Sequence, residues 1–132
     1  MRLLAAAALA AAGALAYPAY VPLCPNGASF PGIAAIGHVD PAGGGANNKF
    51  GVAFANNSHV WNLTLACLDS DGDGFPNGWE LGDPCGNWTG GAAAPMWATD
   101  LSLPGLKAST PKTRTLPLNW AAACGANPCP PS

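Results

Sequence analysis

Charged residues are scarce in this 132-residue chain, which has five lysines and arginines, seven acidic residues and two histidines. With so few bases, the chain offers no basic surface of the kind that nucleic acid requires. The glycine run 43–45 is not followed by Lys-Ser/Thr, so it is not a phosphate loop. Neither Gly-x-Ser-x-Gly nor Cys-x-x-Cys occurs, which excludes the common hydrolase elbow and clustered metal-thiolate sites.

Long hydrophobic runs are also few, and the single one lies at the N-terminus. Met1 and Arg2 precede an apolar run over 3–15, and Ala14-Leu15-Ala16 has the small-x-small pattern of a cleavage site. The run is too short to span a bilayer, and Pro18 ends it. Residues 1–16 are therefore predicted to be a signal peptide, and the mature chain is expected to be secreted, extracellular and free of a membrane anchor.

The cysteines all lie after this segment: Cys24, Cys67, Cys85, Cys124 and Cys129. In a secreted chain cysteines are expected to form disulfides, and an odd count leaves one thiol over. Cys124 and Cys129 are predicted to close a small local ring, because Gly125 and Pro128 between them favour a turn. Cys24 is then the odd thiol, although it could instead pair with either tail cysteine.

Acidic residues are concentrated, since five of the seven lie between residues 69 and 83. Segment 69–80 reads Asp-Ser-Asp-Gly-Asp-Gly-Phe-Pro-Asn-Gly-Trp-Glu and matches the EF-hand calcium loop. Ca²⁺ binds about six to eight oxygens, whereas Mg²⁺ demands a tighter octahedron. A solvated acidic turn without an ion is the alternative, but it would leave four carboxylates repelling one another. The predicted calcium ligands are Asp69, Asp71, Asp73, Phe75 through its backbone carbonyl, Asn77 and Glu80.

The segment after this loop departs from an ordinary EF-hand. Gly82 and Pro84 should stop a second helix almost at once, and Pro76 lacks the N–H that paired EF-hands use. Cys67 and Cys85 bracket the loop, so a disulfide between them would hold its two ends together in place of that helix.

Helical periodicity is clear only before the calcium loop. Ser58 can cap a helix over about 58–68. Its apolar side fits core packing and comprises Val60, Trp61, Thr64, Leu65 and Leu68. Residues 90–132 carry little periodicity and read as a loop-rich extension that contains proline and cysteine. The prediction is a small, loop-rich, disulfide-stabilised α+β domain over 17–89, with an extension over 90–132.

The order of short motifs adds a resemblance. Tyr17-Pro18, Pro25-Asn26-Gly27, Gly37-His38, Asn48-Lys49-Phe50-Gly51, Trp61, the run from Cys67 to Cys85, and Trp88 follow one another. This series, from Tyr17 to about Trp88, resembles the temptin family of small extracellular domains. The resemblance implies a secreted protein that acts by interaction without catalysis, and it also implies a Cys67–Cys85 disulfide. It does not by itself carry over a signalling role.

The leading hypothesis is therefore a secreted, calcium-stabilised module that binds an extracellular protein and is not an enzyme. The alternative is a secreted enzyme, or a redox or copper accessory domain, that uses His38. That alternative requires His38 to lie in a concave pocket beside a second histidine, a cysteine or a carboxylate. Three glycosylation sequons also predict a glycoprotein, with Asn56, Asn62 and Asn87 as acceptors.

Overall fold

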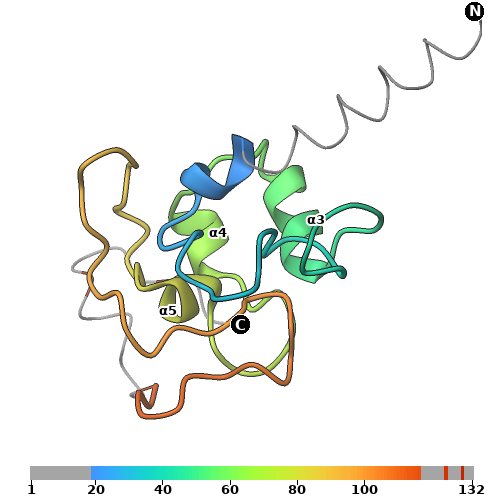
Figure 1. Ribbon diagram of the computed structural model, residues 1–132. Coiled ribbons are helices and arrows are strands. Elements are labelled where there is room, and N and C mark those ends of the chain that lie inside the picture. The colour runs from blue at the N-terminus through green and yellow to red at the C-terminus, as the bar shows by residue number, and fades with distance from the viewer. Residues whose placement is uncertain (1–18, 117–123, 125–128, 130–132) are drawn as a thin grey trace, which may run out of the picture.

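The computed structural model describes residues 19–116 together with Cys124 and Cys129. The predicted signal peptide lies outside these residues. The elements are a short 3-10 helix η1 (Val21–Leu23) and three α-helices, α3 (Lys49–Asn56), α4 (Leu63–Cys67) and α5 (Asn77–Leu81). Figure 1 shows the three α-helices near the middle of the molecule with long loops running around them. None of the described helices is long and apolar enough to cross a membrane.

The loop-rich prediction is confirmed, but its β component is wrong. Across the described residues there is no strand, and the only pairing of this kind is an isolated antiparallel bridge between His38 and Asn47. The glycines over 43–45 that separate these two residues have φ values of 95°, 88° and 67°. Backbone in this left-handed region turns the chain, so the bridge cannot extend into a ladder.

Helix α3 was missed from the sequence, and its start is fixed by Asn48. The Asn48 side chain accepts a 2.9 Å hydrogen bond from the Gly51 N–H, which caps the helix. Its amide group also donates to the carbonyls of Ile36 and His38, at 2.8 and 3.1 Å. One side chain thus joins the helix start to the preceding turn. Phe50 and Phe54, four residues apart, then pack into the core.

The predicted helix over 58–68 is shorter than expected. Ser58 and His59 have φ values of 58° and 56°, a conformation that cannot belong to a right-handed helix. The cap is Asn62, whose side-chain oxygen accepts from the Leu65 N–H at 3.1 Å. Helix α4 therefore begins at Leu63 rather than after Ser58.

The core gathers residues from the three α-helices and from the loops around them: Cys24, Ile36, Phe50, Phe54, Trp61, Leu65, Ala66 and Leu81. Asp83 is buried at its edge and accepts a 2.7 Å hydrogen bond from the Trp61 indole N–H. The same carboxylate accepts the backbone N–H groups of Asn87 and Trp88, at 3.2 and 2.9 Å. This acid is therefore used to fix a turn rather than to bind an ion.

The predicted disulfides are wrong. Cys67 pairs with Cys129 and Cys85 pairs with Cys124, so neither the Cys67–Cys85 bond nor the Cys124–Cys129 ring is present. Each end of the calcium loop is bonded to the tail instead of to the other end. These bonds span 62 and 39 residues, and a longer closed loop removes more entropy from the unfolded chain. Cys24 is the remaining thiol, as predicted, and it is buried.

Candidate calcium site

The loop that follows α4 brings three aspartates together. One oxygen from each of Asp69, Asp71 and Asp73 lies within 4.8 Å of the others. Asp71 is buried, Asp73 is half-buried and Asp69 is exposed. These are the first three predicted ligands, and the loop brings them close together, as the EF-hand spacing requires.

The loop is shaped by hydrogen bonds from its own backbone to these carboxylates. Asp69 accepts N–H groups from Gly72, Asp73 and Gly74, at 2.9, 3.2 and 2.9 Å. Asp73 in turn accepts the Phe75 N–H at 2.8 Å. Gly74, at the sixth loop position with φ of 96°, makes the sharp bend that follows Asp73.

Glu80 lies on α5, close behind this cluster, and its side chain is fully buried. Its Oε1 accepts a 2.6 Å hydrogen bond from the Ser102 hydroxyl. Burial raises the pKa of Glu80 to about 9; the Ser102 hydrogen bond opposes this shift, and the Asp73, Asp71 and Asp69 carboxylates add to it. The charges of the three aspartates therefore affect the pKa of Glu80, although Glu80 is not part of the group that they form.

Three carboxylate oxygens of the site are buried and accept no hydrogen bond from the described residues: Asp71 Oδ2, Asp73 Oδ2 and Glu80 Oε2. Burial, with the nearby charges of Asp73 and Asp69, also raises the pKa of Asp71 to about 7. Buried acceptors without donors are costly, and so is an unpaired buried charge. A divalent cation among these oxygens would remove both costs, so the residues fit the hard, oxygen-coordinated ion that the sequence predicts.

One of the predicted ligands, Asn77, makes hydrogen bonds to α4 and within the loop. The Asn77 amide donates to the Leu65 carbonyl at 2.9 Å and to the Ser70 hydroxyl at 2.8 Å. Its oxygen faces the Ser70 N–H at 3.4 Å. Asn77 thus ties the loop to α4, and its role as a ligand stays a prediction. The Phe75 carbonyl stays a predicted ligand.

Helix α5 takes the place of the second EF-hand helix, but it is only five residues long. It ends at Gly82, whose φ of 86° is the left-handed conformation that commonly closes a helix. Gly78 lets α5 approach α4, because a Cβ there would lie 2.9 Å from the Ala66 Cβ. The expectation that no full second helix follows the loop is confirmed.

A segment of the tail supports α5 from the other side. The Trp97 N–H donates to the Gly82 carbonyl and the Ser102 N–H to the Glu80 carbonyl, both at 3.2 Å. In Figure 1 this segment, coloured ochre to orange, loops around the part of the molecule that carries α5. The Trp79 ring is buried and meets the Trp97 ring edge-on, with centroids 5.1 Å apart. No sequence signal marks Ser102, since a serine in an irregular segment has no distinguishing pattern.

Comparisons with known proteins point to one family. A family model described as Temptin C-terminal matches residues 14–106, which include the whole calcium loop and Ser102. The protein named Temptin, from Aplysia californica, is 40% identical over 117 residues, which cover 83% of this chain and 93% of that protein. The chain belongs to the temptin family. No solved structure matches it.

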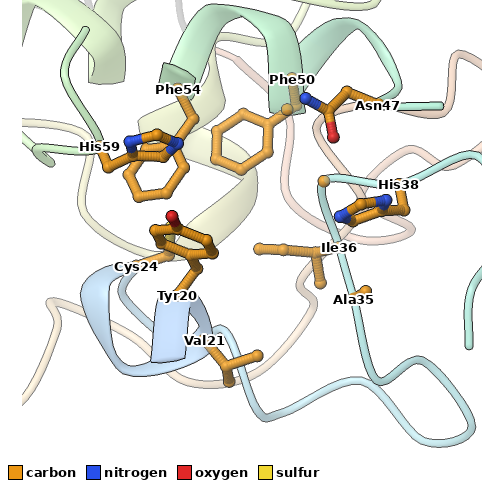
Figure 2. A pocket seen from close by; sticks show the side chains of 12 residues that line it. Tyr20, Val21, Cys24, Ala35, Ile36, His38, Asn47, Phe50, Phe54 and His59 are labelled. Carbon is orange, nitrogen blue, oxygen red and sulfur yellow. The ribbon is translucent and has the colours of Figure 1, made fainter. Parts of the chain in front are cut away.

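In this temptin-family chain, His38 does lie in a concave pocket. His38 is half-buried and lines a cavity that His59 and Cys24 also line. Figure 2 shows the His59 ring at the opposite end from His38, so the geometric condition for the alternative function is met only in part. The three side chains do not form a metal centre. Among the described residues, the three aspartates are the only group of three or more such side chains close enough to hold an ion.

The sequons of this temptin-family chain differ in accessibility. Asn56, at the end of α3, and Asn87 are exposed. The Asn62 oxygen caps α4 and also accepts from the Asn57 amide at 3.0 Å, so a glycan there would compete with the helix cap. Glycosylation at the three sites remains a prediction.

Proposed function

We propose that this chain is a secreted extracellular module whose binding surface is held in shape by one Ca²⁺ and two disulfides, and which binds another protein without catalysing a reaction. Asp69, Asp71, Asp73 and Glu80 would hold the ion, with the Phe75 carbonyl completing the set. The Ser102 hydroxyl would keep Glu80 oriented toward it.

The observation that carries the proposal is the set of three buried carboxylate oxygens without a hydrogen-bond donor. Several carboxylates at one buried place are unstable unless they are protonated or share a cation. The EF-hand spacing from Asp69 to Glu80 favours Ca²⁺. Lone loops of this type have affinities on the order of 10⁻⁴ to 10⁻³ M, which extracellular calcium would largely fill. The ion would therefore have a structural rather than a sensory role.

Secretion is supported by three features that are independent of the calcium loop. The N-terminal segment has the layout of a signal peptide, two disulfides staple the domain, and the chain belongs to the temptin family. A protein partner is inferred from the family likeness together with the absence of a basic surface in the sequence.

Native mass spectrometry of the secreted protein, with and without chelator and reducing agent, tests the composition that we propose. The expected species begins at Tyr17, carries one Ca²⁺ that the chelator removes, and contains two disulfides. A soluble secreted product that retains residues 1–16, or one that carries no calcium in a calcium-rich buffer, would contradict the proposal.

Partner binding is tested by coupling the protein to a surface and passing its native extracellular fluid over it, with calcium or with chelator. Binding of a protein in calcium that is reduced in Glu80→Gln but kept in Asp100→Asn would support a calcium-shaped interaction surface. If the immobilised protein retains no other protein but converts a substrate, the result would support the enzyme alternative instead.

A further inference from the structure

A second site lies on the N-terminal side of the molecule, with no lining residue in the calcium loop. A cavity of about 280 Å³ is enclosed by η1, the turn over 35–38 and helix α3. Figure 2 shows the rings of Tyr20, Phe54 and His59 at one end, His38 and Asn47 at the other, and Phe50 between them. The calcium-stabilised module proposed above makes no use of this cavity.

The cavity has an apolar floor and a polar mouth. Its floor is formed by buried side chains: Cys24, Ala35, Ile36, Phe50 and Phe54. At the mouth, Asn47 is exposed, and 41% of the surface of Tyr20 is accessible to solvent. Apolar walls with a few polar groups near the opening are the usual composition of a small-molecule site.

The size of the cavity limits the ligand. A dry cavity of about 150 Å³ in another protein binds benzene, so one of about 280 Å³ suits a molecule with about two fused rings. Aromatic rings line it from two elements, and Phe50 and Phe54 lie with centroids 6.1 Å apart. Such walls favour a flat aromatic ligand, because ring edges and faces attract each other.

The chemistry of the lining limits the ligand further. Among the described residues, no Asp, Glu, Lys or Arg lines the cavity, so a charged ligand would lose its hydration without a counter-ion. The His59 imidazole and the Asn47 amide together offer hydrogen-bond donors and acceptors, and a hydroxyl group can accept from the one or donate to the other. We propose that this cavity binds a small, uncharged aromatic molecule that carries a hydroxyl group.

The backbone beside the cavity supports this reading. Ser58 and His59 both have positive φ, which costs energy for residues that are not glycine. The result is that the His59 ring stacks on Tyr20 with centroids 4.5 Å apart and meets Phe54 edge-on at 5.1 Å. The strained turn thus builds one wall of the cavity.

Binding rather than catalysis follows from the one nucleophile in the lining. Burial raises the pKa of the Cys24 thiol to about 12, so at neutral pH it is the unreactive thiol rather than the thiolate. No carboxylate lies in the lining to act as an acid or base with either histidine. The cavity that His38 lines is therefore better suited to hold a ligand than to transform one.

The test uses 2-naphthol as the probe and the mature secreted protein in calcium buffer. Binding is followed by NMR, with naphthalene-2-sulfonate as a probe of the same ring size that carries a charge. We expect 2-naphthol to shift signals of lining residues such as Ala35 and Ile36, and the sulfonate to bind at least tenfold more weakly. No binding of 2-naphthol, shifts confined to other regions, or equal or tighter binding of the sulfonate would each overturn the proposal.

Matched variants locate the site. Val21→Trp, which fills the cavity from η1, is expected to weaken 2-naphthol binding at least tenfold. Val52→Trp, at an exposed position of α3 outside the lining, should leave the affinity within twofold. His59→Ala keeps the floor and removes one polar wall, so it should weaken binding several-fold even if Val21→Trp does not fold. Unchanged affinity in His59→Ala, or in a folded Val21→Trp, would contradict a site in this cavity.

Discussion

The hydroxyl of Ser102 donates a 2.6 Å hydrogen bond to Oε1 of Glu80, although the two residues lie 22 positions apart. The Ser102 N–H also donates to the Glu80 carbonyl at 3.2 Å. Both side chains are buried, so water cannot replace either contact. In an ordinary EF-hand a full second helix holds the last ligand in place, whereas here a returning segment of the tail does so. If Ca²⁺ binds as proposed, this relationship makes the region after residue 90 part of its site.

Ser102→Ala is expected to destabilise the protein. In chelator, Glu80 would lose its only described side-chain partner, and a buried polar group left without one costs about 1–3 kcal/mol. In calcium, the apparent affinity should fall as well, because Glu80 is no longer oriented. Urea unfolding in both buffers measures the first effect, and calorimetric titration measures the second. Ser29→Ala, at an exposed position, is the control and should leave both unchanged. If Ser102→Ala matched the wild type in both measurements, the tail segment would have no supporting role.

The disulfides are expected to map as Cys67–Cys129 and Cys85–Cys124 in peptides from non-reduced protein. Replacing Cys67 and Cys129 by serine together should lower the free energy of unfolding by about 4 kcal/mol, the chain-entropy value for a loop of 62 residues. The Cys24→Ala variant should keep both bonds, because Cys24 is a buried thiol. A peptide that joins Cys67 to Cys85 would show that the two ends of the calcium loop are bonded directly.

Asp100 is expected to contribute stability that is lost in acid. The Lys112 N–H, with further donors from Thr113 and Arg114, lowers the pKa of Asp100 to about 2. Because the folded-state pKa lies below the ordinary aspartate value of 3.8, this contribution is present above about pH 4 and is lost as pH falls toward 2. The difference in melting temperature between wild type and Asp100→Asn should therefore shrink over this interval. Asp40→Asn, also exposed, is the control variant. A difference that stays constant from pH 5 to pH 2 would contradict the predicted linkage.

The convergence of the three aspartates could be predicted from the sequence because its geometry is local. Asp69, Asp71 and Asp73 are brought together by bonds within six consecutive residues, from Asp69 to Gly74. The contribution of Ser102 could not be predicted, since it depends on where a distant irregular segment returns. Helix α3 had a readable signal in Asn48 as a cap followed by Phe50 and Phe54, and it was overlooked.

The cysteine pairing also could not be predicted from local sequence. Four cysteines flank the loop or lie in the tail, and spacing alone favoured the two short connections. The correct pairs depend on the tail running back to α4 and α5, which leaves no pattern in the chain.

The start of α4 was misplaced for a local reason: Ser58 and Asn62 are both good caps, and the positive φ of Ser58 and His59 decides between them.

Calorimetric titration of Ca²⁺ into the mature, oxidised protein tests the central claim most directly. The account predicts one site with a dissociation constant on the order of 10⁻⁴ to 10⁻³ M. It also predicts at least tenfold weaker binding in Asp71→Asn, whose buried carboxylate is one of the three that converge, and unchanged binding in Asp40→Asn. No detectable heat of binding in the wild type, or equal affinity in wild type and Asp71→Asn, would contradict a calcium site at Asp69 to Glu80.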